Sequence, residues 1–96
     1  MRLSEEETTS IKRIIAEVFG NDAEVRLFGS RVDDSKRGGD VDLYVTPLQR
    51  DELYMKRVTC LGELERALPY PVDLVISEPD ASRPIDRIAL ETGVTL

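Results

Sequence analysis

Two short groups of residues, separated by a polar loop, could together carry out chemistry on phosphate. Nine residues separate Gly29-Ser30 from Asp40, and Asp42 follows two positions later. Glycine lets the backbone approach a ligand closely because it has no Cβ, and a serine at a helix start adds a hydroxyl to N–H groups that bind phosphate. On one strand, Asp40 and Asp42 point to the same face with Cα atoms roughly 6.5 Å apart. Carboxylates at that spacing suit one or two hard divalent cations, so the pattern indicates metal-assisted phosphoryl or nucleotidyl transfer.

The wider sequence around these groups resembles a known family signature. The segment Leu27-Phe28-Gly29-Ser30 is followed, after the nine-residue spacer, by Asp40-Val41-Asp42-Leu43. This is similar to the signature of the DNA polymerase beta-like nucleotidyltransferase superfamily, in which Gly-Ser precedes Asp-hydrophobic-Asp-hydrophobic. The chain most resembles the minimal nucleotidyltransferase (MNT) family of small prokaryotic proteins, which are often the antitoxin half of a pair with a HEPN-domain protein. The resemblance covers most of the chain, including Asp73 on a later strand and the ending Gly93-Val94-Thr95-Leu96.

Three aspartates are the candidate catalytic and metal-binding residues. Asp40 and Asp42 could instead be solvated positions of an amphipathic strand, but two aspartates on one strand face repel each other unless a cation lies between them. Asp73, in Pro-Val-Asp-Leu-Val-Ile, could by itself be an ordinary exposed strand residue. The resemblance implies that it is the third carboxylate, which holds the ion near the acceptor hydroxyl and can take its proton. We therefore expect Asp40, Asp42 and Asp73 to hold one or two Mg²⁺ ions.

Gly29, Ser30 and Arg31 are the candidate nucleotide-binding residues. Gly29-Ser30 could be a plain turn, but its spacing from the aspartate pair favours phosphate binding. The resemblance implies that the nucleotide is ATP, with its β- and γ-phosphates over Gly29-Ser30. Arg31 resembles the arginine that often follows Gly-Ser in the minimal family and would reach the triphosphate. Pairing of Arg31 with Asp33 or Asp34 on the surface is an equal alternative.

Composition limits the classes of function. The chain has 96 residues, 41% of them hydrophobic, and a net charge of −6 from 19 acidic and 13 basic side chains. A protein that binds long nucleic acid needs clustered Lys and Arg, so we expect no such partner. The absence of histidine from the sequence excludes histidine bases and nearly all zinc-site designs. With one cysteine and no signal peptide or long apolar run, we expect a cytoplasmic protein that does not enter the membrane.

Residue patterns predict three helices and three strands. We expect helices over 4–19, 49–68 and from Pro84 to Gly93, and strands over 23–28, 40–46 and 72–76. Ser4 and Glu7 have the spacing of a capping box, and Pro47 closes the second strand because it lacks an N–H for the ladder. In the second helix, an apolar stripe is predicted to face the core; it consists of Tyr54, Val58, Leu61, Leu64 and Leu68.

Alternation within the strands predicts a sheet with two different faces. Every second residue is apolar in each strand, in the sets Val25 and Leu27; Val41, Leu43 and Val45; and Val72, Leu74 and Ile76. We therefore expect the α/β (α+β) class, with a small mixed β-sheet, helices packed on one face, and Asp40, Asp42 and Asp73 on the open face. The resemblance to the nucleotidyltransferase fold, and not the alternation, places strand 72–76 beside strand 40–46.

Residues 1–96 are expected to form one minimal nucleotidyltransferase domain, with no residues left for a second domain that would hold an acceptor. The acceptor is then either a small molecule on the open face or part of another protein. The resemblance implies the second: transfer of AMP to a tyrosine hydroxyl of a HEPN toxin, within a hetero-oligomer in which this chain acts as antitoxin. An alternative is a binding module that neutralises the partner by contact alone. A third is an acidic domain without a ligand.

Overall fold

The computed structural model describes residues 3–29 and 40–96. In this part of the chain, three helices and four strands follow one another in the order α1 (Glu5–Phe19), β1 (Glu24–Phe28), β2 (Val41–Thr46), α2 (Leu53–Ala67), β3 (Val72–Ile76), α3 (Pro84–Thr92) and β4 (Val94–Thr95). The strands form one mixed sheet in the order β3-β2-β1-β4. β1 is antiparallel to β2 and β4, whereas β2 and β3 are parallel. The α+β class and the placement of β3 beside β2 are confirmed.

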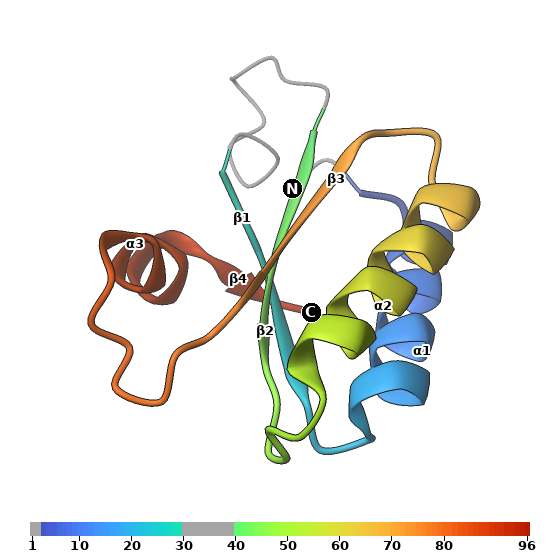
Figure 1. Cartoon of the computed structure of the whole chain (residues 1–96). Coiled ribbons are helices and arrows are strands. Elements are labelled where there is room, and N and C mark those ends of the chain that lie inside the picture. Colours follow the sequence, from blue (N-terminus) through green and yellow to red (C-terminus); the bar gives the residue numbers. More distant parts are fainter. Residues whose placement is uncertain (1–2, 30–39) are drawn as a thin grey trace.

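The main core lies between the sheet and the pair of helices α1 and α2, which cover one face together (Figure 1). The predicted apolar parity is confirmed, because the strand residues buried against these helices are Val25, Leu27, Val41, Leu43, Val45 and Leu74. α1 begins with the predicted capping box, in which the Glu7 N–H donates to Ser4 Oγ (3.0 Å) and the Ser4 N–H donates to Glu7 Oε1 (2.9 Å). Burial of each large aliphatic side chain in this layer stabilises the fold by roughly 1.5–3 kcal/mol.

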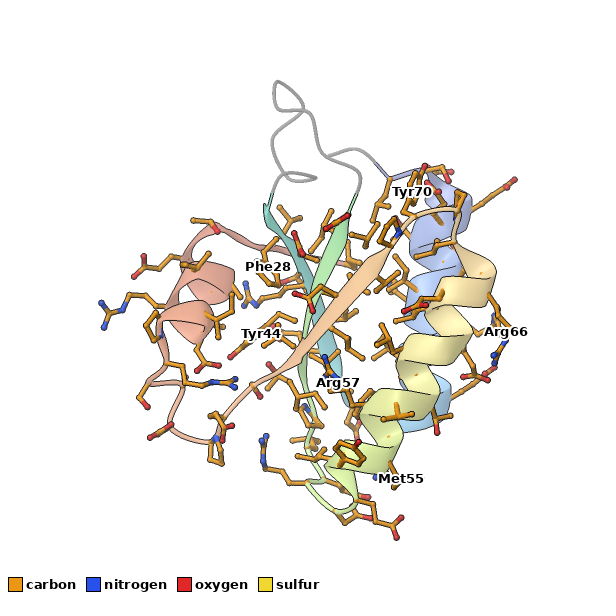
Figure 2. The ribbon with its side chains drawn as sticks, turned by 45° about the horizontal axis from the view of Figure 1, so that its top comes forward. Phe28, Tyr44, Met55, Arg57, Arg66 and Tyr70 are labelled. Atoms are coloured by element: carbon orange, nitrogen blue, oxygen red, sulfur yellow. The ribbon has the colours of Figure 1, made fainter. Side chains whose placement is uncertain are left out.

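α3 packs on the opposite face of the sheet, so that this face is not open along its whole length (Figure 1). A second, smaller core forms there from Phe28, Tyr44 and Ala89, with Val75 and Ile85 packed against it. The rings of Phe28 and Tyr44 meet edge to face, with centroids 6.5 Å apart and an interplanar angle of 89°. Figure 2 shows both rings on the side of the sheet that α3 covers. The expectation of an open carboxylate face therefore holds only for the part that α3 leaves uncovered.

A buried polar network holds α3 against the sheet. Asp86, in the first turn of α3, is fully buried and accepts a 2.5 Å hydrogen bond from the Tyr44 hydroxyl. Arg83 donates to both oxygens of the same carboxylate, from Nε at 2.8 Å and from Nη2 at 2.9 Å. These bonds, led by those from Arg83, lower the pKa of Asp86 far below its ordinary value of 3.8. Ionised Asp86 therefore stabilises the fold above pH 3.8, and this contribution is lost as the pH falls from there through the lowered pKa.

The structure corrects the predicted second helix. α2 begins at Leu53, not at residue 49, and the predicted core residues Tyr54 and Val58 are exposed, at 77% and 48%. The later members of the predicted stripe do face the core, because Leu64 and Leu68 are buried and Leu61 packs against the core. The inward side of α2 also includes Cys60, which the pattern did not assign to the core. Arg57 lies on that side with its Nε donating to the Leu74 carbonyl at 2.8 Å. A charged side chain with an apolar stem therefore occupies a position that the pattern assigned to solvent.

Two further features complete the described fold. β4, which the sequence did not predict, has only two residues and pairs with Arg26 and Leu27 at the edge of the sheet. Cys60 is fully buried in the core between α2 and the sheet, and burial raises the pKa of its thiol to about 12. The free cysteine is thus a packing residue in the folded protein.

Removal of the Tyr44 hydroxyl tests the network beneath α3. Tyr44→Phe keeps the ring and deletes the donor to buried Asp86, so the free energy of unfolding should fall by about 1–3 kcal/mol. Tyr54→Phe is the matched control, because the same atom is removed from a side chain that is 77% exposed. Its effect should stay within about 0.5 kcal/mol. Denaturant unfolding of the two variants and wild type makes the comparison, and equal effects would contradict a supporting role of the Tyr44–Asp86 bond.

Candidate active site

Gly29 brings the backbone directly against the carboxylate of Asp42. Gly29 follows β1, whose last residue, Phe28, is paired with Asp42 in the antiparallel register. Its φ is +78°, a left-handed value that side chains disfavour, and a Cβ built there would overlap Asp42 Oδ2. The close approach therefore requires glycine for two independent reasons, one conformational and one steric. The sequence predicted that Gly29 approaches a ligand, which stays a prediction; its contact with Asp42 is an additional feature of the structure.

The parallel register places Asp42 directly beside Asp73. The two residues are Cα partners in β2 and β3, so their side chains share a face with Cα atoms roughly 4.8 Å apart. Asp40 is exposed immediately before β2, and Asp73 is exposed on the edge strand, whereas Asp42 is partly buried between them. Burial raises the pKa of Asp42, and the negative charges of Asp73 and then Asp40 raise it further. The three predicted carboxylates are thus close enough to repel one another.

These carboxylates do not converge on one point as ligands of a bound ion do. Among residues 3–29 and 40–96, no group of three His, Cys, Asp or Glu side chains is arranged to hold a metal ion. Repulsion between like charges keeps carboxylates apart when no cation lies between them. The donor set itself, three carboxylates around a close approach of bare backbone, matches the oxygen ligands that Mg²⁺ takes. Asp40, Asp42 and Asp73 are therefore the residues that would hold it.

The rest of the predicted nucleotide site lies beyond the described part of the chain. Ser30 and Arg31 belong to residues 30–39, which the structure does not describe. Their proposed contacts with phosphate stay predictions. Gly29 is the member of the predicted nucleotide-binding group whose position is known.

The sequence did not reveal the support beneath the site. Tyr44 lies two residues after Asp42 on the same strand and face, and Asp86 of α3 holds its hydroxyl. An acidic residue in the first turn of a helix is ordinarily a solvated partner of the helix dipole, so Asp86 gave no signal of burial. The one hint in the sequence is that Phe28 and Tyr44 each follow a core-facing leucine, so that alternation directs them to the carboxylate face. Two large aromatic residues there require a cover, which α3 provides.

Residues 9–94 match the nucleotidyltransferase domain family, a match that spans most of the chain. The chain therefore belongs to the nucleotidyltransferase domain family. A comparison with curated proteins found no match. None of the helices α1, α2 and α3 of the described residues is long and apolar enough to cross a membrane.

The raised pKa of Asp42 predicts that its charge destabilises the metal-free protein. Stability linked to this group is fully present below pH 3.8 and is lost as the pH rises through the raised pKa of the folded state. In EDTA at neutral pH, Asp42→Asn should therefore increase the free energy of unfolding by about 0.5–2 kcal/mol. The gain should shrink as the pH is lowered towards 3.8.

The matched control for Asp42→Asn is Asp22→Asn, which removes the same charge from an exposed turn. Its effect should stay within about 0.5 kcal/mol at every pH. Chemical denaturation of both variants and wild type between pH 4 and pH 8 measures the difference. A loss of stability in Asp42→Asn would show that the aspartate is structurally paired and would contradict a carboxylate cluster.

A methyl group at Gly29 should lower the free energy of unfolding more than the same change at Gly20. Gly20→Ala provides the control, because Gly20 also has a left-handed φ, +102°, but a Cβ there meets nothing within 4 Å. Both variants carry backbone strain of about 1–2 kcal/mol. Gly29→Ala must also displace Asp42, which should cost about 1–3 kcal/mol more. Thermal or chemical unfolding measures the stability of both variants. An equal loss of stability in the two would contradict the tight packing of Gly29 on Asp42.

Proposed function

We propose that the chain is a Mg²⁺-dependent nucleotidyltransferase that transfers AMP from ATP to a hydroxyl group of a partner protein. Family membership supports nucleotidyl transfer in general. The observation that carries the proposal is the pairing of Asp42 with Asp73 across parallel strands, with Gly29 packed on Asp42. Mutual repulsion makes this arrangement unfavourable in isolation, and such charge clusters are typical of functional sites.

The site residues divide the proposed transfer into phosphate binding, metal binding and proton removal. The bare backbone at Gly29 admits the phosphates of the nucleotide. Asp40, Asp42 and Asp73 would hold one or two Mg²⁺ ions, which neutralise charge on the triphosphate and on the attacking oxygen. Asp73 is exposed on the edge strand, where an acceptor can approach from solvent, and it takes the hydroxyl proton. The acceptor oxygen bonds to the α-phosphorus, and pyrophosphate leaves with the electron pair of the broken bond.

The acceptor is proposed to belong to a second protein. The elements from Glu5 to Thr95 all belong to one sheet and its helices, so the described residues contain no separate acceptor-binding domain. The resemblance to minimal nucleotidyltransferases suggests a cytoplasmic HEPN-domain toxin as partner, with a tyrosine as the modified residue. In this proposal the chain binds the toxin in a hetero-oligomer and silences it as an antitoxin.

We expect a HEPN-domain protein to be encoded beside this chain, and transfer of AMP is tested with that protein. Incubation with ATP and Mg²⁺ should add one or more AMP masses to the partner, as measured by intact mass spectrometry. Asp42→Asn should abolish the addition, and Asp22→Asn should retain it. Saturating Mg²⁺ and ATP should also stabilise wild type, by about 2.7 kcal/mol at a hundred times the dissociation constant. Inhibition of an unmodified partner by both wild type and Asp42→Asn would instead establish a binding module that acts by contact.

A further inference from the structure

A groove of about 380 Å³ lies between the N-terminal half of α2 and the end of β3 that is remote from Asp73. Its walls include three arginines, Arg50, Arg57 and Arg83, and the exposed ring of Tyr54. Asp73 and Ile76 are three strand positions apart, which corresponds to roughly 10 Å. The groove therefore adjoins the candidate active site without sharing any of its proposed catalytic residues.

Backbone carbonyls hold the arginines of the groove in place. Arg57 donates to the Leu74 carbonyl at 2.8 Å, Arg83 donates to the Ile76 carbonyl at 2.7 Å, and Arg50 donates to the Ser77 carbonyl. β3 is an edge strand, and its residues alternately direct their backbone groups towards β2 and towards the open edge. The Leu74 and Ile76 carbonyls lie on the open edge, so Arg57 and Arg83 occupy acceptors that an added strand would use.

Two of these arginines carry positive charge that no described carboxylate neutralises. Arg83 pairs with Asp86 and Glu78. Arg50 and Arg57 form no ion pair with a carboxylate of residues 3–29 or 40–96. A guanidinium group has five N–H donors, and each of these two uses one on a carbonyl. Oriented cations with unused donors are notable in a chain whose net charge is −6.

One exposed apolar side chain, Tyr54, lines the charged groove, and Val58 follows it one turn later on α2. The large hydrophobic residues exposed over residues 48–58 are Leu48 (71%), Tyr54 (77%), Met55 (62%) and Val58 (48%). The sequence pattern assigned Tyr54 and Val58 to the core, but both side chains are exposed in the structure. Scattered apolar residues need no explanation, but an exposed Tyr among three Arg side chains has the composition of a protein interface. Figure 2 shows Arg57 directed from α2 towards β3, whereas Arg66 points away from the sheet.

We propose that this groove binds an acidic segment of a partner protein, with a carboxylate on Arg50 and Arg57 and an apolar side chain against Tyr54 and Val58. The groove is lined by three arginines and one carboxylate, Glu78, which pairs with Arg83, so its net positive charge favours an anionic occupant. The apolar rim favours a protein segment over nucleic acid, which the surplus of negative charge on this chain would repel. Because Arg57 and Arg83 already cap the edge of β3, the segment is held by side-chain contacts and not as an additional strand.

Titration with defined peptides tests the groove without nucleotide or activity. The probe is the acetylated, amidated pentapeptide Glu-Glu-Leu-Glu-Glu, added to ¹⁵N-labelled full chain in two-dimensional amide NMR spectra. We expect saturable shifts confined to the amides of groove residues such as Tyr54, Arg57 and Ile76. The counterpart with glutamine for every glutamate should bind at least about tenfold more weakly, because charge-assisted hydrogen bonds are lost.

Single substitutions locate the contact. Arg57→Ala and Arg50→Ala should each weaken peptide binding by about tenfold. Arg66→Ala is the matched control, because it removes the same charge from an exposed position of α2 outside the groove, and it should leave binding unchanged. Tyr54→Ala should also weaken binding. The side chains of Arg50 and Tyr54 are exposed, so these two variants keep the fold even if Arg57→Ala does not.

Four outcomes would overturn the proposal. Groove amides that do not shift at millimolar peptide would show that no acidic segment binds. Equal affinity for the glutamine peptide would exclude recognition by charge. Tighter binding of inorganic phosphate or a single-stranded oligothymidylate would assign the groove to phosphate. Concentration-dependent dimerisation that buries Tyr54 would assign the surface to a second copy of the chain. A failure of AMP transfer would leave this titration unaffected, so the two proposals can fail separately.

Discussion

The register between β2 and β3 is the constraint on which the candidate site depends. Leu43 and Leu74 are paired across these strands, and both are fully buried against the layer of α1 and α2. A slip of one residue would turn this apolar set towards solvent, so burial fixes the register. The same register places Asp42 beside Asp73 on the other face, although their charges repel each other. Hydrophobic burial on one side of the sheet thus maintains an electrostatically unfavourable arrangement on the other.

Two aspartates on the α3 side of the sheet show how differently the protein treats negative charge. Asp86 is fully buried, yet its pKa is lowered, because Arg83 and Tyr44 satisfy both oxygens of its carboxylate. Asp42 is only partly buried, yet its pKa is raised, because burial and the neighbouring carboxylates oppose its charge. The charge of Asp86 is balanced within the fold, whereas that of Asp42 is opposed by burial and by its neighbours and is the charge that the proposed Mg²⁺ would balance. This contrast distinguishes the structural carboxylate Asp86 from the candidate site residue Asp42 more clearly than exposure does.

The strands, the first helix and the position of the aspartates could be predicted from sequence because period-two alternation and capping are local signals. The inward residues Leu61, Leu64 and Leu68, in and directly after the second half of α2, could also be predicted. Those of its first half could not, because Arg57 donates to the Leu74 carbonyl and so a charged residue occupies an inward position. The cover provided by α3 depends on the bond between Tyr44 and Asp86, which are 42 residues apart in sequence. β4 is too short, at two residues, to give a periodic pattern. The contacts of Ser30 and Arg31 lie outside the described residues and stay predictions.

The location of Cys60 has a practical consequence for measuring motion in this protein. Its thiol is fully buried between α2 and the sheet, its pKa is raised to about 12, and the sequence contains no second cysteine. Thiolate is the reactive species, so an alkylating reagent can modify the folded chain only when α2 separates from the sheet. The rate of mass increase on alkylation therefore reports one defined opening event. An alkylation rate higher than the rate of global unfolding would show that α2 separates from the sheet while the rest of the protein stays folded. Equal rates would show that Cys60 is exposed only when the whole protein unfolds.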